Sequence, residues 1–286
     1  MDPNDRLGDI RPGWHVTLFT MLRWSFRLDK EFLFSLTGIP LCERLRLIIC
    51  KYLFFLRDRL MQSGSPRKAV VFGRRYLYND RYGLGSLQRV YCSSRELKGI
   101  VSDHPVVVDV GANLGQFNLF CRHYLGAERV ISIEPVPSSY RLLAENAGVP
   151  SDCLNALVTG DEGETIFYVA RDSQLSSTVR DDTALCHEAL KLHGTPLDRV
   201  LEGMGLDRID LLKIDTEGSE LEVLRSAEKT LEKTGAVLVE MSIFRKSTGN
   251  IFAVGSFLES RGFRLSELVF GEKTHPADAD GIFIRI

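Results

Sequence analysis

The chain has 286 residues, of which 44% are hydrophobic and 26% charged, with a formal net charge of −2 at pH 7. This length and composition allow a full hydrophobic core and exclude a disordered or low-complexity chain, and the small net charge gives no reason to expect nucleic acid as a partner. The six cysteines form no Cys-x-x-Cys pair. Scattered cysteines in a chain of this size favour reduced thiols and a cytoplasmic location over a disulfide framework.

The first 68 residues predict a helical N-terminal extension with a basic surplus. Residues 1–68 carry a net charge of about +5 and the remainder about −7. Residues 14–60 are rich in Leu, Phe, Ile and Arg, which predicts two or three helices separated near Gly38-Ile39-Pro40. The longest apolar stretch, residues 47–56, contains Lys51 and is too short to span a bilayer.

Two uses of this extension stay open. In one, residues 14–60 form an amphipathic arm that contacts a partner or the surface of an anionic membrane. In the other, they form a helical cap that packs on the rest of the protein. The run Ser63-Gly64-Ser65-Pro66 is typical of a linker, so the expected organisation is an extension of residues 1–68 and a second domain of residues 69–286.

The second domain shows alternating strand-like and helix-like segments. After an expected strand at 69–78 and an expected helix at 86–100, the predicted strands are residues 106–110, 129–134, 153–158, 209–214, 236–242, 263–269 and 281–286. Helices are expected between several of them, for example at 219–233 and 250–261, and residues 187–193 also have a helix-like pattern. Alternation predicts an α/β fold with a mainly parallel seven-stranded sheet and helices on both faces. The last two strands have no helix between them, so they should form a hairpin that places one antiparallel strand in the sheet.

A glycine-containing turn follows the first strand of this sheet, Asp109-Val-Gly111-Ala-Asn113-Leu-Gly115. Glycine allows a sharp turn off a strand and a close approach of the backbone to a ligand. The motif lacks the G-x-G-x-x-G order of dinucleotide folds, because Asn113 stands between the glycines and an acid precedes them. A carboxylate suits a cation better than a polyphosphate, which favours S-adenosyl-L-methionine, a ligand with ammonium and sulfonium groups and no phosphate.

A second acid, Glu134, ends the next strand and precedes Pro135. An acid at this place accepts hydrogen bonds from ribose hydroxyls in nucleotide-binding folds. The alternative is that Asp109 only caps the following helix and that the glycines only form a turn. Asp109 and Glu134 end two successive expected strands, and this arrangement favours a ligand site over a simple turn.

Two further carboxylates follow the strand at 209–214, Asp215 and Glu217. Ligands of open sheets bind outside the carboxyl ends of the strands, so these side chains should lie beside the cofactor. Two uses stay open for them: either acid acts as a general base, or the pair holds a divalent cation. Two carboxylates do not define a metal site, so no metal is predicted. For Glu217, an acid at a helix N-terminus is the simpler alternative.

Lys213 and Glu240 are candidate substrate contacts at the same edge. Lys213 shares a strand face with Asp215, because side chains alternate along a strand, and pairing with that carboxylate is its simplest role. Glu240 stands near the end of the fifth expected strand.

These blocks together resemble the FkbM family of S-adenosylmethionine-dependent methyltransferases. The matching motifs are Asp109-Val-Gly-Ala-Asn-Leu-Gly115, Ile133-Glu134-Pro135 and Lys213-Ile-Asp-Thr-Glu-Gly218. Asn155 falls in a stretch similar to the family segment after strand three, and Thr216 departs from the small apolar residue that many members carry. The similarity runs from about Phe72 to the last residue.

The resemblance implies a Rossmann-like class I methyltransferase that O-methylates a hydroxyl of a sugar, a polyketide-type compound or another small metabolite. In this assignment the Asp109–Gly115 turn holds the amino-acid end of the cofactor, Glu134-Pro135 its ribose, and Asn155 lies near its adenine. Asp215 with Glu217 orients or deprotonates the acceptor. A non-catalytic S-adenosylmethionine-binding module and an NAD(P)-dependent oxidoreductase stay open as alternatives, as does a homo-oligomer.

Overall fold

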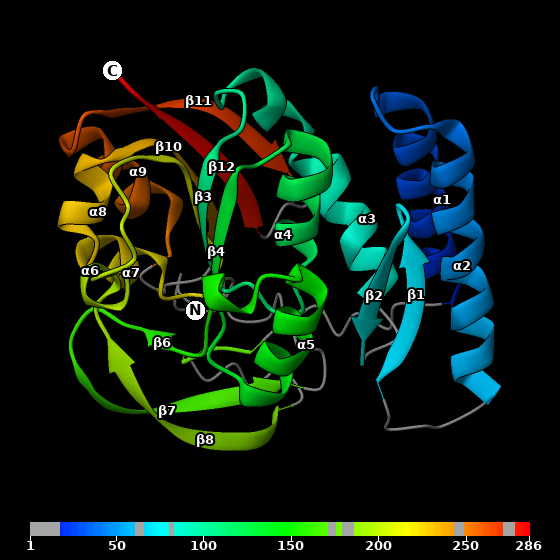
Figure 1. The fold of residues 1–286 in the computed structure, drawn as a ribbon, viewed down its shortest axis with the longest axis horizontal. Coiled ribbons are helices and arrows are strands. Elements are labelled where there is room, and N and C mark those ends of the chain that lie inside the picture. The colour runs from blue at the N-terminus through cyan, green and yellow to red at the C-terminus, as the bar shows by residue number, and fades with distance from the viewer. Residues whose placement is uncertain are drawn as a thin grey trace, which may run out of the picture.

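A computed structural model describes residues 18–60, 66–79, 83–170, 176–178, 186–242, 249–270 and 278–286. The central element is a seven-stranded sheet with the strand order β11-β12-β10-β9-β3-β4-β5 (Figure 1). Its strands are β3 (Val106–Val110), β4 (Arg129–Ile133), β5 (Cys153–Leu154), β9 (Ile209–Ile214), β10 (Thr234–Ser242), β11 (Phe263–Phe270) and β12 (Asp278–Arg285).

The sheet is parallel except for the last strand. β3, β4, β5, β9 and β10 pair in parallel, whereas β12 runs antiparallel to both β10 and β11. This confirms the predicted Rossmann-like sheet with one reversed strand. The order also changes direction between β3 and β9, and such a switch point leaves a crevice at the carboxyl ends of the strands.

Helices cover both faces of the sheet, because the central strands are apolar on both sides. Val107 faces a core shared with α3 (Gly83–Ser93) and α4 (Gln116–Phe120), while Val108 faces the opposite core. That second core is covered by α6 (Leu197–Val200), α7 (Glu220–Arg225), α8 (Glu228–Glu232) and α9 (Ile251–Ser260), on the left of Figure 1. α5 (Pro137–Ala147) lies beside α4, and short 3₁₀ and π-helical turns occupy Arg95–Gly99, Cys121–Leu125 and Pro150–Asp152.

A small second sheet was not predicted from the sequence. It has the order β6-β8-β7, formed by β6 (Leu157–Val158), β7 (Gly163–Ala170) and β8 (Cys186–Thr195). The helix expected at residues 187–193 is therefore wrong, because this segment pairs antiparallel with β7. The strand expected at 153–158 is also divided, since β5 joins the large sheet and β6 joins the small one.

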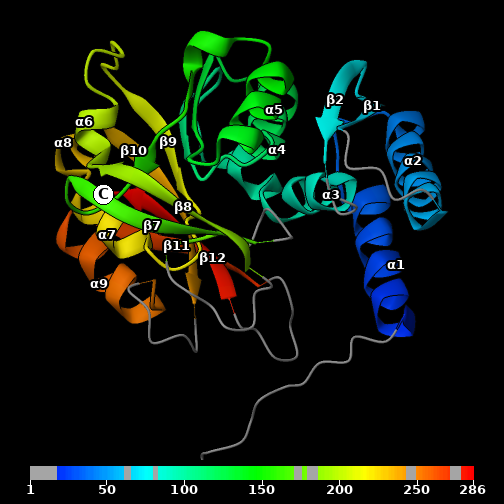
Figure 2. The ribbon, with the colours of Figure 1, turned by 90° about the horizontal axis from the view of Figure 1, so that it is seen from below.

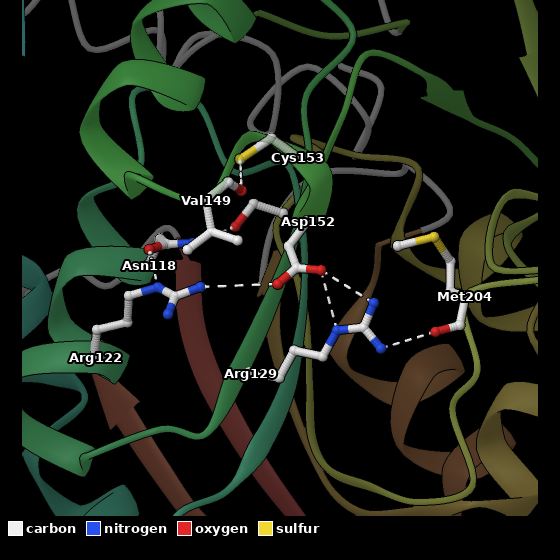
Figure 3. A network of polar contacts seen from close by, with 8 residues as sticks. Asn118, Arg122, Arg129, Val149, Asp152, Cys153 and Met204 are labelled. Carbon is white, nitrogen blue, oxygen red and sulfur yellow. Dashed lines mark hydrogen bonds and ion pairs between the residues drawn. The ribbon is translucent and has the colours of Figure 1, made fainter.

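A polar network holds the sheet at the amino-terminal ends of β4 and β5, opposite the crevice at the carboxyl ends (Figure 3). Asp152, just before β5, accepts a hydrogen bond of 3.0 Å from Nε of Arg129 at the start of β4. Arg129 also donates to the carbonyl oxygen of Met204, and Arg122 lies 4.0 Å from the second Asp152 oxygen. These contacts connect the amino-terminal ends of β4 and β5 to the segments around them.

The N-terminal residues form a helix hairpin, α1 (Leu18–Ser35) and α2 (Leu41–Leu60), followed by the strand pair β1 (Arg67–Val71) and β2 (Arg74–Tyr78). Phe32, Leu36 and Leu47 are buried in the same core as α3 and α4. The hairpin forms the side of the molecule farthest from α8 (Figures 1 and 2). Across the described ranges, no helix combines the length and the apolar character needed to cross a membrane.

Polar contacts fix the inner side of this hairpin. Lys51 of α2 pairs with Asp29 of α1 and donates to Gln88 of α3 at 2.9 Å, while Tyr52 donates to Asp29 at 2.6 Å. The two-domain division at residue 68 stays a prediction, and the expected linker residues Ser63-Gly64-Ser65 lie outside the described residues.

Candidate functional site

A cavity of about 300 Å³ opens where the switch point of the sheet predicts one. Its wall includes the turn after β3, the end of β4, the Asp215–Glu217 segment after β9, and one face of α3. Of the residues predicted from the sequence, the cavity brings together Gly111, Asn113, Glu134, Pro135, Lys213, Asp215, Glu217 and Glu240.

Gly111 allows the segments that follow β3 and β9 to pass close to each other. Its φ is +82°, and a Cβ added there would lie 1.8 Å from the carbonyl oxygen of Asp215. The Asp215 backbone N–H in turn donates to the carbonyl of Val110 at 3.1 Å. Gly115 is left-handed as well (φ +86°) and precedes α4. A side chain at Gly111 would push the two loops apart, so only glycine fits.

Asn113 offers an unused amide to the cavity. It is left-handed (φ +47°), a conformation that Asn tolerates better than most residues. Both polar atoms of its side chain are buried and have no hydrogen-bond partner among the described residues. A buried polar group without a partner costs about 1–3 kcal/mol, so a bound molecule that pairs with this amide would recover that cost.

Glu134 is buried at the end of β4, and both its oxygens are held by the backbone. Oε2 accepts from the N–H of Asn113 and Oε1 from the N–H of Val136, each at 2.9 Å. Burial raises the pKa of Glu134 to about 7, although the two N–H donors favour its charged form. Each oxygen keeps a further lone pair, so Glu134 can still accept from a ligand hydroxyl.

Asn155 lies beside this site but is absent from the cavity wall. Its side-chain amide donates to the carbonyl oxygens of Glu134 (2.8 Å) and Pro135 (3.0 Å). The neighbouring Ala156 and Leu157 line the cavity instead. In this structure Asn155 therefore fixes the end of β4.

Lys213 connects two of the predicted acids. Its Nζ lies 3.3 Å from Asp109 Oδ1 and 3.1 Å from Asp215 Oδ2. Burial lowers the pKa of Lys213, but the two carboxylates raise it by more, so the ammonium stays charged. Asp109 is fully buried and absent from the cavity wall, and burial raises its pKa against the opposing effect of Lys213. Lys213 thus balances the charge of the buried Asp109, and it also pairs with Asp215, which lines the cavity.

Three carboxylates of the cavity wall converge. Asp215, Glu217 and Glu240 each place one oxygen so that all three lie within 4.8 Å of one another. Burial raises the pKa of Glu240 well above its usual range, and the charges of Asp215 and Glu217 raise it further. Glu217 has φ +54°, a strained conformation for a residue other than glycine. Together, these three carboxyl groups can accept hydrogen bonds from several hydroxyl groups or hold a cation.

The sequence profile of the methyltransferase FkbM domain matches residues 109–265. The chain belongs to the FkbM methyltransferase family. It is 26% identical over 198 residues to Methyltransferase sdnD of Sordaria araneosa, covering 57% of this chain and 75% of that protein. It is 25% identical over 209 residues to the hexuronic acid methyltransferase AglP of Haloferax volcanii, covering 68% and 83%. A crystal structure of Methyltransferase FkbM from Methylobacillus flagellatus aligns with a TM-score of 0.44 and 16% identity, over 71% of this chain and 54% of that one.

Individual side chains of this FkbM methyltransferase site, on α3 and β12, were not predicted from the sequence. α3, which precedes the matched FkbM segment, lines the cavity with Ser86 and Arg89, and β12 adds the fourth acid, Asp280. Burial raises the pKa of Asp280 to about 6, while Arg89 acts in the opposite direction. The spacing of Ser86, Arg89 and Ser93 marks one helix face, but only the packing of α3 shows what that face meets.

Glu220 is a further missed residue, and it shapes the turn that carries Glu217. Its buried Oε1 accepts from the N–H groups of Gly218 (2.8 Å) and Thr216 (3.2 Å) and from the Thr216 hydroxyl. Thr216, the departure from the family pattern, therefore adds a donor to this turn. The signal in the sequence is the acid at position 220, at the start of the helix that follows the strand.

Proposed function

We propose that the protein is an S-adenosyl-L-methionine-dependent methyltransferase that transfers a methyl group to a hydroxyl of a sugar, a polyketide-type compound or another small metabolite. Membership of the FkbM methyltransferase family supports the transfer reaction and argues against the oxidoreductase alternative. The observation that carries the cofactor assignment is the pair of Asn113, with its unpartnered buried amide, and Glu134, beside the turn at Gly111.

These residues fit the cofactor chemically. Glu134 accepts hydrogen bonds from the ribose hydroxyls, the role of the acid after the second strand in nucleotide folds. The Gly111–Gly115 turn presents backbone groups and the Asn113 amide to the amino-acid end, and Asp109 with Lys213 fixes the strand beneath it. Pro135 closes the wall next to Glu134. When bound, S-adenosyl-L-methionine supplies an activated methyl group on a sulfonium.

The remaining tasks for the chain are to align the acceptor and to accept its proton. Asp215 is the proposed base, because it lines the cavity and its charge is compensated by Lys213 at 3.1 Å. Glu217 and Glu240 accept hydrogen bonds from other acceptor hydroxyls. Asp215, Glu217, Glu240 and Asp280 give this wall several hydrogen-bond acceptors for hydroxyl groups, so we propose a neutral, hydroxyl-rich acceptor for this chain, in contrast to the hexuronic acid in the name of the Haloferax relative.

The test is a transfer assay with S-adenosyl-L-methionine labelled in its methyl group. Neutral sugars, hexuronic acids and polyketide-type alcohols are offered in parallel to the unaltered chain and to Asp215→Asn. We expect label on a neutral polyol, and at least a hundredfold lower turnover in Asp215→Asn, within the usual contribution of a general base. Asp215→Asn with full turnover and unchanged cofactor affinity would remove the proposed base. Transfer to hexuronic acids alone would overturn the acceptor class.

A further inference from the structure

Helix α2 carries apolar side chains on two opposite faces. Its inner face, with Leu47 and Phe54, packs against the core that includes α3 and β1. A second row faces solvent, at intervals of three or four residues that keep it on one side of the helix. This outer row consists of Leu41, Leu45, Ile49, Leu53 and Leu56, which are between 43% and 60% exposed.

α1 extends the outer row into a wider surface. Phe26 is 64% exposed and Phe34 is 77% exposed, and they lie eight residues apart on one helical face. The ring of Phe26 lies 6.3 Å from that of Tyr52 on α2, so the exposed faces of the two helices adjoin. We call the outer row together with Phe26 and Phe34 the hairpin face. Isolated exposed apolar residues are ordinary, but a continuous group of them marks an interaction surface.

The charges that accompany the hairpin face are basic. Arg27 and Lys30 on α1 and Arg46 on α2 are exposed, and none of them has an ion-pair partner among the described residues. Two acids of α1 are paired with cations, Asp29 with Lys51 of α2 and Glu31 with Arg95, which follows α3. The outward surface of the hairpin therefore combines apolar side chains with exposed cations.

We propose that the hairpin face rests on an anionic lipid surface. Its apolar side chains would enter the boundary between headgroups and acyl chains, while Arg27, Lys30 and Arg46 meet the lipid phosphates. Charge decides between this occupant and a second copy of the chain. Two hairpin faces brought together would oppose the same exposed cations, whereas an anionic surface neutralises them.

The position of the hairpin fits contact with a surface. α1 and α2 lie at the side of the molecule remote from the seven-stranded sheet, with α3 between the hairpin and the sheet (Figures 1 and 2). No described helix is long and apolar enough to cross a bilayer, so the hairpin would lie along the surface.

Co-sedimentation of the full chain with vesicles tests this proposal. Vesicles of phosphatidylcholine alone are compared with vesicles that also contain phosphatidylserine. We expect binding to the mixed vesicles, a loss of binding as salt is raised, and little binding to phosphatidylcholine alone. Arg46→Gln should weaken binding to the mixed vesicles by about fivefold, the factor for one cation near an anionic surface.

A double variant, Ile49→Asp with Leu53→Asp, should abolish binding while keeping the melting temperature, because both side chains already face solvent. Phe252→Asp on α9 is the matched control, since Phe252 is 78% exposed but lies outside the hairpin. Vesicle binding that the double variant retains, or that the unaltered chain never shows, overturns the proposal. If sedimentation velocity instead shows a dimer that the double variant dissociates, the hairpin face is an interface between copies and the lipid proposal is wrong. Cofactor titration is independent of all these outcomes.

Discussion

Gly111 shows most directly how one residue sets the geometry of the site. The turn after β3 passes so close to the turn after β9 that a Cβ at Gly111 would lie 1.8 Å from the Asp215 carbonyl oxygen. Asp215 is the proposed base and the Gly111 turn the proposed cofactor cradle. The proposed base and the proposed cofactor site therefore meet at one backbone contact, which requires glycine at position 111.

Replacing Gly111 by alanine should disrupt folding and ligand binding together. A left-handed alanine alone costs about 1–2 kcal/mol, and the collision with Asp215 adds to it. Gly203→Ala is the matched control, because Gly203 has φ +79° but open space around it. Urea unfolding measures both variants. Equal losses of stability in the two would show that the contact with Asp215 does not constrain position 111.

Glu134 should give stability and cofactor affinity opposite dependences on pH. Burial raises its pKa from 4.5 to about 7, so the folded protein takes up a proton that the unfolded chain has lost. Its contribution to stability is complete below pH 4.5 and is lost as the pH rises through about 7. Cofactor affinity should rise over the same range, because the ionised carboxylate is the better acceptor for hydroxyl groups.

Glu134→Gln, which cannot ionise, provides the comparison for this pH dependence. Urea unfolding and calorimetric titration, each from below pH 5 to above pH 7, should show flatter profiles for the variant. Unchanged slopes in the variant would assign the pH dependence to another group.

At the scale of elements, the strands that carry the site follow from local pattern. Val106-Val107-Val108 is buried on both sides, and such continuous apolar runs are typical of central parallel strands. β8 does not follow from local pattern, because its Glu188-Ala-Leu-Lys-Leu192 segment consists of residues with good helix propensity. Pairing with β7 overrides that preference.

Tertiary contacts also explain why the helix expected at 219–233 is broken into α7 and α8. The hydroxyl of Ser226 donates to the carbonyl of Val223 and accepts from the N–H of Leu197. Asp198 then accepts from the backbone N–H of Thr230 in α8. Arg89 and Asp280 were missed for a related reason, since they meet the predicted acids only through the packing of α3 and the reversal of β12.

The network around Asp152 should stabilise the sheet measurably. Asp152→Ala leaves Arg129 and Arg122 without their shared carboxylate, and both are partly buried. We expect a loss of about 1–3 kcal/mol in the free energy of unfolding, with cofactor affinity unchanged, because the network is at the far edge of the sheet. Glu145→Ala removes an exposed pair with Arg75 and should cost less than about 1 kcal/mol. Equal effects of the two changes would mean that the Asp152 network adds nothing beyond a surface ion pair.

At the scale of the whole molecule, the N-terminal hairpin and one face of the sheet share one continuous core. The inner face of the hairpin packs with α3, and α3 lines the cavity. Sequence composition already separates a basic N-terminal part from an acidic remainder, but it does not show that α2 is apolar on two faces. That distinction requires the fold, because only packing shows which row is covered.

Cofactor binding is the central claim, and isothermal titration of the full chain tests it most directly. S-adenosyl-L-methionine, S-adenosylhomocysteine and NADH are titrated side by side into the unaltered chain, Glu134→Ala and the control Glu145→Ala. We predict micromolar binding of the first two ligands, no heat with NADH, and at least about tenfold weaker binding in Glu134→Ala alone, as expected for loss of hydrogen bonds to a charged group. Binding of NADH alone, or of none of the three, would contradict the assignment.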